Sequence, residues 1–350
     1  MILLKGFLSP IQSREGSLLV FTLWVLVLLS LFTAAVGYQV RQRLRFLQTI
    51  EHRSLLRNAV DSGLQRSLQR GYVALDNEKK EPDEHALKEQ DDESVYKEIP
   101  VGAAYFNVRY RGIDGRWIYG LRDEESKLNI NTLTQLRPLE QLIHAATLLD
   151  SNESSNIAAA IMDWKDSDDI LNAGGAETRY YRQQQPPYAA KNKPFETLEE
   201  MLLLKGMTVE IFQKLKRHIS LNADEKININ TATEPVLLAR GMGENLIGRI
   251  MAYRQGKDRI LNTRDDLIFT DKSSIVSNLE AFSGLGKQEK QSLEDFIAAE
   301  TFDVVSTHYT ARIEGHIKHR HESLEKECVI GNDGSVIRCR ENFYRSPEKA

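Results

Sequence analysis

The feature that most constrains this chain is an uncharged, apolar run near its N-terminus, from Ser17 to Val40. As an α-helix these 24 residues would extend about 36 Å, enough to cross a hydrocarbon core about 30 Å thick. A secretory signal has a shorter apolar region, about 7–15 residues, followed by a cleavage site of small residues. The run therefore predicts a retained transmembrane helix, with removal after the small residues 33–35 as the alternative.

The charges on either side of this run do not settle its orientation. Two basic residues, Lys5 and Arg14, precede it, whereas three arginines follow it directly, at positions 41, 43 and 45. Basic residues favour the cytoplasmic side of a membrane, so a count over these flanks would place the rest of the chain in the cytoplasm.

The two cysteines, Cys328 and Cys339, indicate the opposite side. Asp333-Gly334 between them is a signal for a β-hairpin with a two-residue turn, which would place the cysteines directly opposite each other. Opposed residues lie within the Cα separation that a disulfide tolerates. We favour a disulfide over two free thiols, and a disulfide implies an oxidising compartment.

The 350 residues carry a formal net charge of −4, so there is no overall basic field to attract nucleic acid. Along the chain, helical spacing of apolar residues continues past the apolar run, followed by a highly charged stretch, alternating strand patterns, a long helical region and further strands. The simplest arrangement is one α+β domain with a helical insertion. Its predicted segments are a helix over 17–75, a charged linker over 76–98, strands over 99–123, a helical insert over 124–299 and strands over 300–350.

The helical region contains an internal repeat. "KLNINT" at Lys127 and "KININT" at Lys226 are each followed by an apolar helical stretch, which predicts two duplicated helical units. We expect the N-caps of the following helices among the Asn-Thr pairs 131–132 and 230–231. A weaker repeat aligns "FETLEEMLLLKGM" with "ILNTRDDLIF".

The densest polar feature lies within the first unit, in "DWKDSDDILNAGGAE". Four carboxylates that fall within seven residues repel one another unless a cation or several donors offset their charge. Oxygen-rich loops of this kind are what Ca²⁺ requires. The alternatives are a solvated helix end and a pair of catalytic carboxylates. The candidate ligands are Asp163, Asp166, Asp168, Asp169 and Glu177.

Other enzymatic and DNA-binding patterns are weak. The sequence has no nucleophile elbow, phosphate-binding loop or metalloprotease signature, so we assign no catalytic residue. Gly241-Met242-Gly243 resembles the turn of a helix-hairpin-helix unit, in which backbone amides and nearby basic residues bind phosphates. A membrane-anchored DNA-binding protein of the competence type is therefore the alternative function, with Arg249 and Arg254 as its candidate phosphate contacts.

Taken together, these segments resemble the general secretion pathway protein K family, the large minor pseudopilin of type II secretion systems. The resemblance rests on "EGSLLVFTLWVLVLLSLFTAAV", "LNINTL", "DWKDSDD…GGAETRYY", "PPYAAKNKPFETLEEMLLLKGM" and "ININTATEPVLL", and it covers nearly the whole chain. It implies a pilin-like α+β domain with a long N-terminal transmembrane helix and an antiparallel sheet, interrupted by an all-α insert with units like the sterile alpha motif. It also implies Ca²⁺ in the head and no enzymatic activity.

The resemblance further implies how the N-terminus is processed. A prepilin peptidase would remove a leader, residues 1–16, by cutting between Gly16 and Ser17, and the new amine of Ser17 would be methylated. Where most pilin-like chains carry Glu as the fifth residue after the cut, this chain has Phe21. We expect a single-pass protein of the bacterial inner membrane with its head in the periplasm, at the tip of a pseudopilus. Its expected partners are the I-type and J-type minor pseudopilins and the major pseudopilin, with no nucleic acid.

Overall fold

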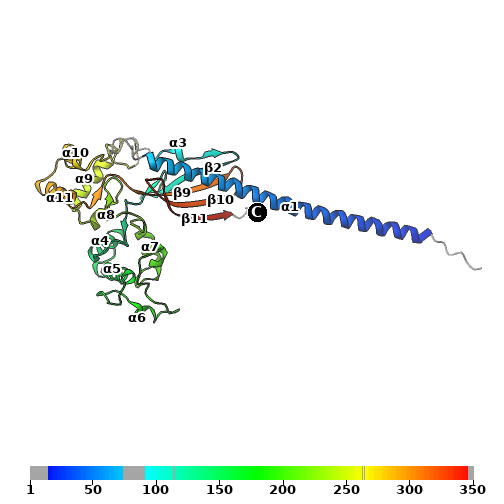
Figure 1. Ribbon diagram of the computed structural model, residues 1–350, viewed down its shortest axis with the longest axis horizontal. Helices are drawn as coiled ribbons and strands as arrows, with labels where there is room; N and C mark the ends of the chain where they lie inside the picture. Colours follow the sequence, from blue (N-terminus) through cyan, green and yellow to red (C-terminus); the bar gives the residue numbers. More distant parts are fainter. Residues whose placement is uncertain (1–14, 74–90, 113–114, 262, 264, 346–350) are drawn as a thin grey trace, which may run out of the picture. The chain divides into compact units, whose positions relative to one another are not determined.

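The computed structural model describes residues 15–73, 91–112, 115–261, 263 and 265–345. Most of the predicted leader and most of the charged linker therefore lie outside the described residues. The chain divides into two compact units, residues 1–55 and 56–350, which are described separately. The first unit consists of the N-terminal part of α1 (Glu15–Val73), whose most apolar window has a mean hydropathy of 2.5 and no buried residue. By length and composition this helix can cross a membrane (Figure 1).

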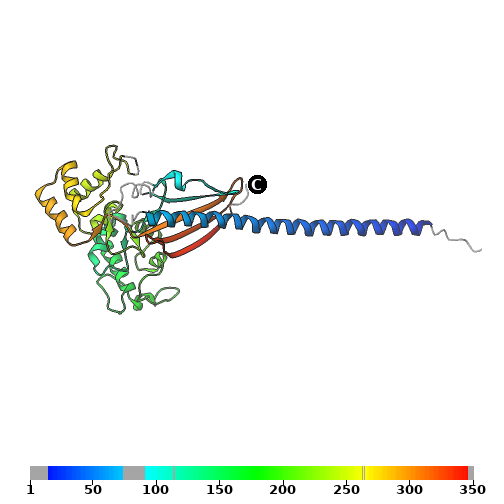
Figure 2. The same ribbon diagram turned by 45° about the horizontal axis from the view of Figure 1, so that its top comes forward.

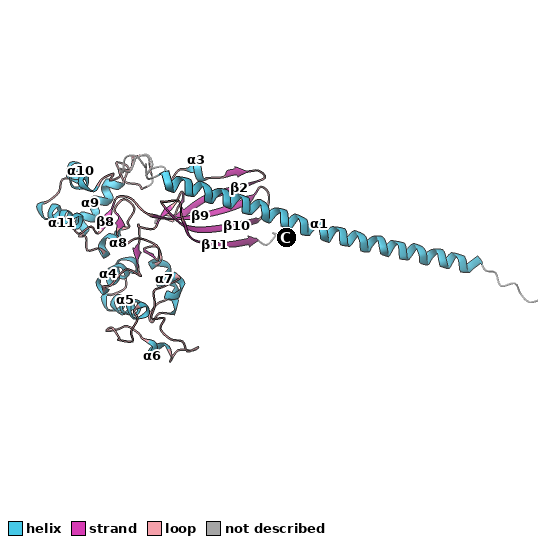
Figure 3. Cartoon of the chain, viewed as in Figure 1, coloured by secondary structure: helices cyan, strands magenta, loops and turns pink. Residues whose placement is uncertain are grey.

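The second unit contains an antiparallel sheet (Figure 3). Its strands run in the order β1-β2-β9-β10-β11, with β3 paired to β2 and β4 paired to β9. A helical turn, α3, precedes the sheet within the predicted linker. The bounds are α3 (Glu93–Tyr96), β1 (Ile99–Val101), β2 (Ala104–Arg111), β3 (Trp117–Tyr119), β4 (Arg122–Asp123), β9 (His308–Ile317), β10 (Glu322–Gly331) and β11 (Val336–Arg345).

The C-terminal part of α1 packs closely on one face of this sheet. A β-carbon on Gly63 would lie 2.6 Å from Ile313 Cγ2, and one on Gly315 would lie 2.9 Å from Val60 Cγ1 and 3.0 Å from the Leu56 carbonyl oxygen. Leu56 and Val60 are fully buried. The two glycines therefore allow a separation between helix and sheet that larger residues would prevent.

The hairpin of β10 and β11 carries the two cysteines. Cys328 pairs directly with Cys339, and the two form a disulfide, at the predicted register. The turn differs from the predicted two-residue turn, because the amide of Gly331 donates to the carbonyl of Ser335 and Gly334 has a positive φ of 81°. This is a three-residue loop, and a bulge after Val329 restores the register that a two-residue turn would have set.

The insert between β4 and β9 is helical. Its helices are α4 (Leu136–Thr147), α5 (Ser151–Lys165), α6 (Thr178–Tyr181), η1 (Leu198–Leu203), α7 (Val209–Leu215), α8 (Glu234–Ala239), α9 (Glu244–Arg254), η2 (Lys272–Ser274), α10 (Ile275–Ser283) and α11 (Lys287–Ala298). Two short parallel pairs close its units: β5 (Leu128–Asn129) with β6 (Ile219–Ser220), and β7 (Ile227–Asn228) with β8 (Phe302–Asp303). Figure 2 shows the α4–α7 group beside the α8–α11 group.

In each helical unit the second Asn of the repeated Asn-Ile-Asn-Thr motif makes two hydrogen bonds to the backbone of one distant residue, and we call this pair of bonds the clamp. Asn131 donates to the carbonyl of Phe195 at 3.0 Å and accepts from its amide at 2.9 Å. Asn230 does the same with Phe269, at 2.8 Å for both bonds. The prediction that these Asn-Thr pairs cap the following helices is wrong, since α4 and α8 have Gln135 and Thr233 at their N-caps.

The clamp also corrects the weaker sequence repeat. Phe195 and Phe269 are structural equivalents, and two residues beyond them Thr197 and Asp271 are the N-caps of the short helices η1 and η2. "FETLEEM" is therefore equivalent to "FTDKSSI", which begins at the last residue of the segment aligned from sequence, "ILNTRDDLIF".

A basic residue that donates to a backbone carbonyl ends the second helix in each helical unit. Lys165, the last residue of α5, donates from Nζ to the carbonyl of Leu133. Arg254, the last residue of α9, donates to the carbonyl of Ala232 at 2.6 Å. Leu133 and Ala232 occupy the same position after the repeated motif, so the two units share one architecture.

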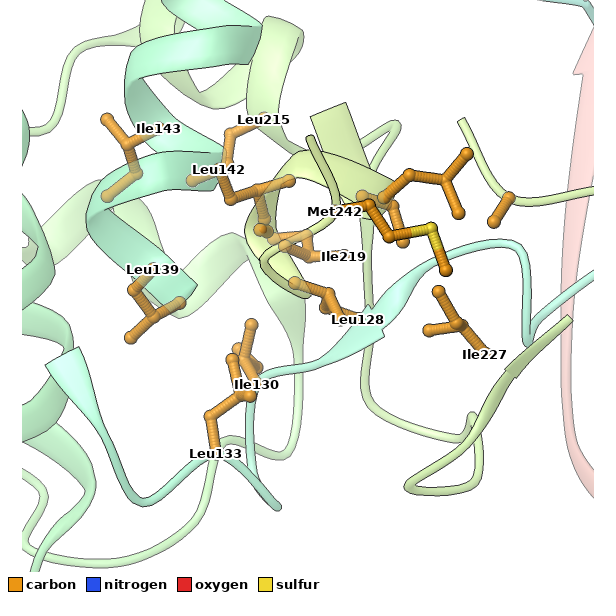
Figure 4. Packing of buried hydrophobic residues seen from close by; sticks show 14 of the residues in the cluster. Leu128, Ile130, Leu133, Leu139, Leu142, Ile143, Leu215, Ile219, Ile227 and Met242 are labelled. Carbon is orange, nitrogen blue, oxygen red and sulfur yellow. The ribbon is translucent and has the colours of Figure 1, made fainter. Parts of the chain in front are cut away.

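Apolar residues from both helical units of the insert form one core. In Figure 4, Leu139, Leu142 and Ile143 of α4 lie near Leu215 of α7, together with residues of the short strands. Ile227 and Met242 extend the same cluster into the second unit. Burial of such side chains is the main stabilising contribution to the insert.

Candidate metal centre

The acidic cluster starts in the last turn of α5. Asp163 is fully buried on the inner face of this helix, next to Trp164. One of its oxygens, Oδ1, accepts hydrogen bonds from the amide and the side chain of Asn172, at 3.1 and 2.5 Å. The other, Oδ2, is buried and has no hydrogen-bond donor among the described residues.

Two further carboxylates approach Asp163 from the chain that follows. Asp166 is the C-cap of α5, and Glu177 is the N-cap residue of α6. One oxygen from each of Asp163, Asp166 and Glu177 lies within 4.8 Å of the others. Oxygens at these separations can share one cation, since Ca²⁺ holds its ligands at about 2.3–2.6 Å.

These groups lack the partners that buried carboxylates need. Within the described part of the chain, Asp166 Oδ1 and both oxygens of Glu177 are buried without a hydrogen-bond donor. Burial, together with the charges of Asp163, Asp166 and Asp169, raises the pKa of Glu177 to about 7. Burial and the neighbouring carboxylates also raise the pKa of Asp166. Four oxygens without donors, on groups that repel one another, fit a bound divalent cation.

The Gly174-Gly175 pair makes room for this cluster. A β-carbon on Gly175 would lie 2.0 Å from Asp163 Oδ2, closer than any side chain permits. Gly174 has a positive φ of 86°, in the left-handed region. Lys205 donates to the carbonyls of both glycines, at 3.1 and 3.0 Å, and so fixes the loop against the cluster.

The structure brings together three of the five predicted ligands. Asp168 is exposed, and its Oδ1 accepts from the amide of Ile170 at 2.8 Å, as in a solvated turn. Asp169 is also exposed, with its Oδ1 3.4 Å from the side-chain amide of Asn192. It lies beside Glu177 on the rim of a surface hollow. Asp169 therefore adds charge beside Glu177 and Asp168 adds charge beside Asp166, but neither lies among the three grouped carboxylates.

Sequence reasoning missed a second polar cluster, where the insert leaves the sheet. Residues 123–127 are all buried. Asp123 accepts from Thr231, and Glu125 hydrogen-bonds His308 at 2.9 Å, which raises the pKa of the histidine. These contacts tie β4 to the second helical unit and to β9. A run of charged residues predicts a solvent-exposed segment, and no spacing in the sequence indicates that this one is buried.

The two arginines of the DNA-binding alternative are engaged within the protein. Arg249 pairs with Glu289 at 2.9 Å and donates to the carbonyl of Ser283. Arg254 is 5% exposed and bonded to Ala232. Neither guanidinium is presented as a free phosphate contact, so the DNA-binding alternative is not favoured.

Comparison with known proteins agrees with this description. A sequence profile of the family "Type II secretion system (T2SS), protein K" matches residues 126–224. Type II secretion system protein K of Klebsiella pneumoniae is 35% identical over 77 residues, which are 22% of this chain and 24% of that protein. The protein K of Aeromonas hydrophila is 23% identical over 249 residues, which are 65% of this chain and 70% of that protein.

A solved structure shares the fold. It is a chain of the crystal structure of the GspK-GspI-GspJ complex from the enterotoxigenic Escherichia coli type 2 secretion system, with a TM-score of 0.58 at 19% identity. The match covers 87% of this chain and 99% of that chain. A long N-terminal helix on an antiparallel sheet, interrupted by a helical insert, is a pilin-like fold. The profile match and the relatives show that the chain is similar to type II secretion system protein K, and it spans about a quarter of the length of the Klebsiella protein.

Proposed function

We propose that the chain is a minor pseudopilin that acts at the tip of a type II secretion pseudopilus and initiates or caps its assembly. The observation that carries this proposal is the family match to residues 126–224, inside an otherwise pilin-like fold. The proposed role is structural, in protein export across the outer membrane, and assigns no catalytic residue.

The proposed partners follow from the same likeness. The related chain in the solved structure is part of a complex named for GspK, GspI and GspJ. We propose that this chain likewise assembles with I-type and J-type minor pseudopilins, above the major pseudopilin. Purification of the full chain from membranes should recover both minor partners in fixed proportion, and their absence from the purified chain would contradict this part.

The proposed location is the bacterial inner membrane, with the head in the periplasm. The apolar part of α1 supports a single membrane crossing, and the disulfide between Cys328 and Cys339 supports an oxidising compartment for the head. Prepilin peptidase would act between Gly16 and Ser17 and leave a methylated amine on Ser17.

Phe21 supports the tip position. A carboxylate within a membrane costs a few kcal/mol unless it is paired. In a growing filament the Glu of other subunits can pair with the N-terminal amine of the subunit inserted before it. A subunit inserted first has no such predecessor, so Phe is the more stable choice. Phe21→Glu should leave processing intact without improving assembly, and a gain in assembly would contradict the tip position.

Calcium is the proposed ligand of the head, held by Asp163, Asp166 and Glu177, with Asp169 close enough to add charge. Bound Ca²⁺ would supply positive charge that keeps three mutually repelling carboxylates ionised and fixes the loop between α5 and α6. The site offers only part of a full coordination shell, so backbone carbonyls and water would complete it.

A further inference from the structure

Three side chains that can bind a metal meet where the insert joins the sheet, and they come from separate segments. Glu125 follows β4, Asp224 lies between β6 and β7, and His308 is the first residue of β9. One ligand atom from each of the three lies within 4.8 Å of the others. None of them belongs to the Asp163 cluster, and this group differs in kind from that cluster because it includes an imidazole.

The separations of the ligand atoms fit a small metal ion. His308 Nδ1 is 2.9 Å from Glu125 Oε1 and 3.9 Å from Asp224 Oδ1. A tetrahedral ion with bonds of about 2.0–2.2 Å holds its ligand atoms about 3.4 Å apart, between these two distances. Side-chain movements of about 0.5 Å would therefore place all three atoms on one ion, with the ion in place of the proton on Nδ1.

The same atoms have too few hydrogens for the contacts that they make. Thr307 Oγ1 lies 2.9 Å from Glu125 Oε1 and 2.5 Å from Asp224 Oδ2. It also lies 2.8 Å from His308 Nδ1. The hydroxyl has one hydrogen and Nδ1 has at most one, so two hydrogens serve four contacts of 2.5–2.9 Å. Lone pairs face each other across the remaining contacts, and such convergence indicates a place for a cation.

The charge around His308 is negative. Its imidazole is under the influence of Glu125, Asp224 and Glu124. Glu124 is ion-paired with the buried Lys127, which leaves Glu125 and Asp224 facing the imidazole. Glu125 is 3% exposed, whereas Asp224 lies at the surface, so the site is both shielded and open to an ion from solvent. A divalent cation offsets two carboxylates, and an imidazolium offsets one.

We propose that Glu125, Asp224 and His308 form a binding site for a divalent transition metal ion, Zn²⁺ above all. A nitrogen ligand with carboxylates suits zinc, whereas calcium takes oxygen ligands in larger number. Water would complete the tetrahedral shell. The ion would join the end of β4, the connection between the two helical units and the start of β9, and so fix the insert on the sheet. The inference rests on this junction and does not depend on the pseudopilin role.

The test measures zinc binding by isothermal titration calorimetry, on the full chain purified without a polyhistidine tag and held in detergent micelles. Excess Ca²⁺ is present to occupy the Asp163 cluster. We expect one Zn²⁺ per chain and a higher unfolding midpoint with zinc. His308→Gln and Asp224→Asn should each weaken zinc binding by about tenfold or more, since loss of even an outer-shell partner costs that much. Asp224→Asn keeps an oxygen that accepts from Thr307, and circular dichroism without zinc checks that both variants are folded.

His321→Gln is the matched control, because His321 is exposed between β9 and β10 and lies outside the group of three. It removes an imidazole from "HIKHRH", the other histidine-rich stretch, and should leave zinc binding unchanged. Asp163→Asn should also leave zinc binding unchanged, which separates this site from the calcium site. Absence of zinc binding, unchanged binding in folded Asp224→Asn or His308→Gln, or loss of binding in either control would each overturn the proposal.

Discussion

Removal of calcium should destabilise the folded head, because four buried carboxylate oxygens around Asp163 would lose the partner that we propose for them. Calcium at one hundred times its dissociation constant adds about 2.7 kcal/mol to the free energy of unfolding. A change of 1 kcal/mol moves the unfolding midpoint of a large domain by about 2–4 °C. We therefore expect excess EGTA to lower the midpoint by about 5–10 °C, measured by circular dichroism on the full chain in detergent micelles.

The effect of calcium on stability should also depend on pH. Without calcium the pKa of Glu177 is raised to about 7, so the folded chain retains a proton that the unfolded chain releases above about pH 4.5. The calcium-free protein should therefore lose stability as the pH rises between these values. Calcium competes with that proton and binds better at higher pH. The difference between calcium and EGTA should be larger at pH 7.5 than at pH 5.5.

Two substitutions separate a metal site from a merely acidic loop. Asp163→Asn keeps the bond from Asn172 to Oδ1 possible but removes the central charge, and it should abolish the response to calcium. Asp168→Asn changes an exposed carboxylate five residues away and should preserve that response. A midpoint that EGTA leaves unmoved at pH 7.5 would refute the reasoning, as would equal effects of the two substitutions.

Three further results are expected. Asn131→Ala and Asn230→Ala should each cost about 2–4 kcal/mol in urea unfolding, since each leaves a buried amide and carbonyl unpaired, and a cost near zero would exclude the clamp. Gly315→Ala should cost about 1–3 kcal/mol, because its β-carbon would meet α1 at 2.9 Å, and an unchanged midpoint would show that the helix can shift. Replacing Cys328 and Cys339 by serine should cost about 2–3 kcal/mol for their sequence separation of 11, seen as a lower urea midpoint than that of the oxidised chain.

The repeated motif shows how far sequence reasoning reached. The duplication was visible in "NINT", because both units need the same residues. The role of Asn131 was not visible in the sequence, because an asparagine before a helix is usually a cap. Its actual partner, Phe195, is 64 residues away, and nothing in local spacing points to a contact at that distance.

The acidic cluster shows a similar limit. Its composition indicated a cation site, and the structure brings Asp163, Asp166 and Glu177 together. Sequence spacing could not separate Asp168 from these, because the chain turns outward after α5. The burial of the charged residues 123–127 had no signal in the sequence, because burial of charged groups depends on partners supplied by distant strands and loops.

The measurement that tests the central claim most directly is intact-mass and fragment mass spectrometry of the mature protein purified from membranes. The proposed minor pseudopilin should begin at Ser17 with one methyl group on its N-terminal amine. A chain that still begins at Met1, or one cut near Ala35, would contradict the claim that the apolar helix is both processed and retained.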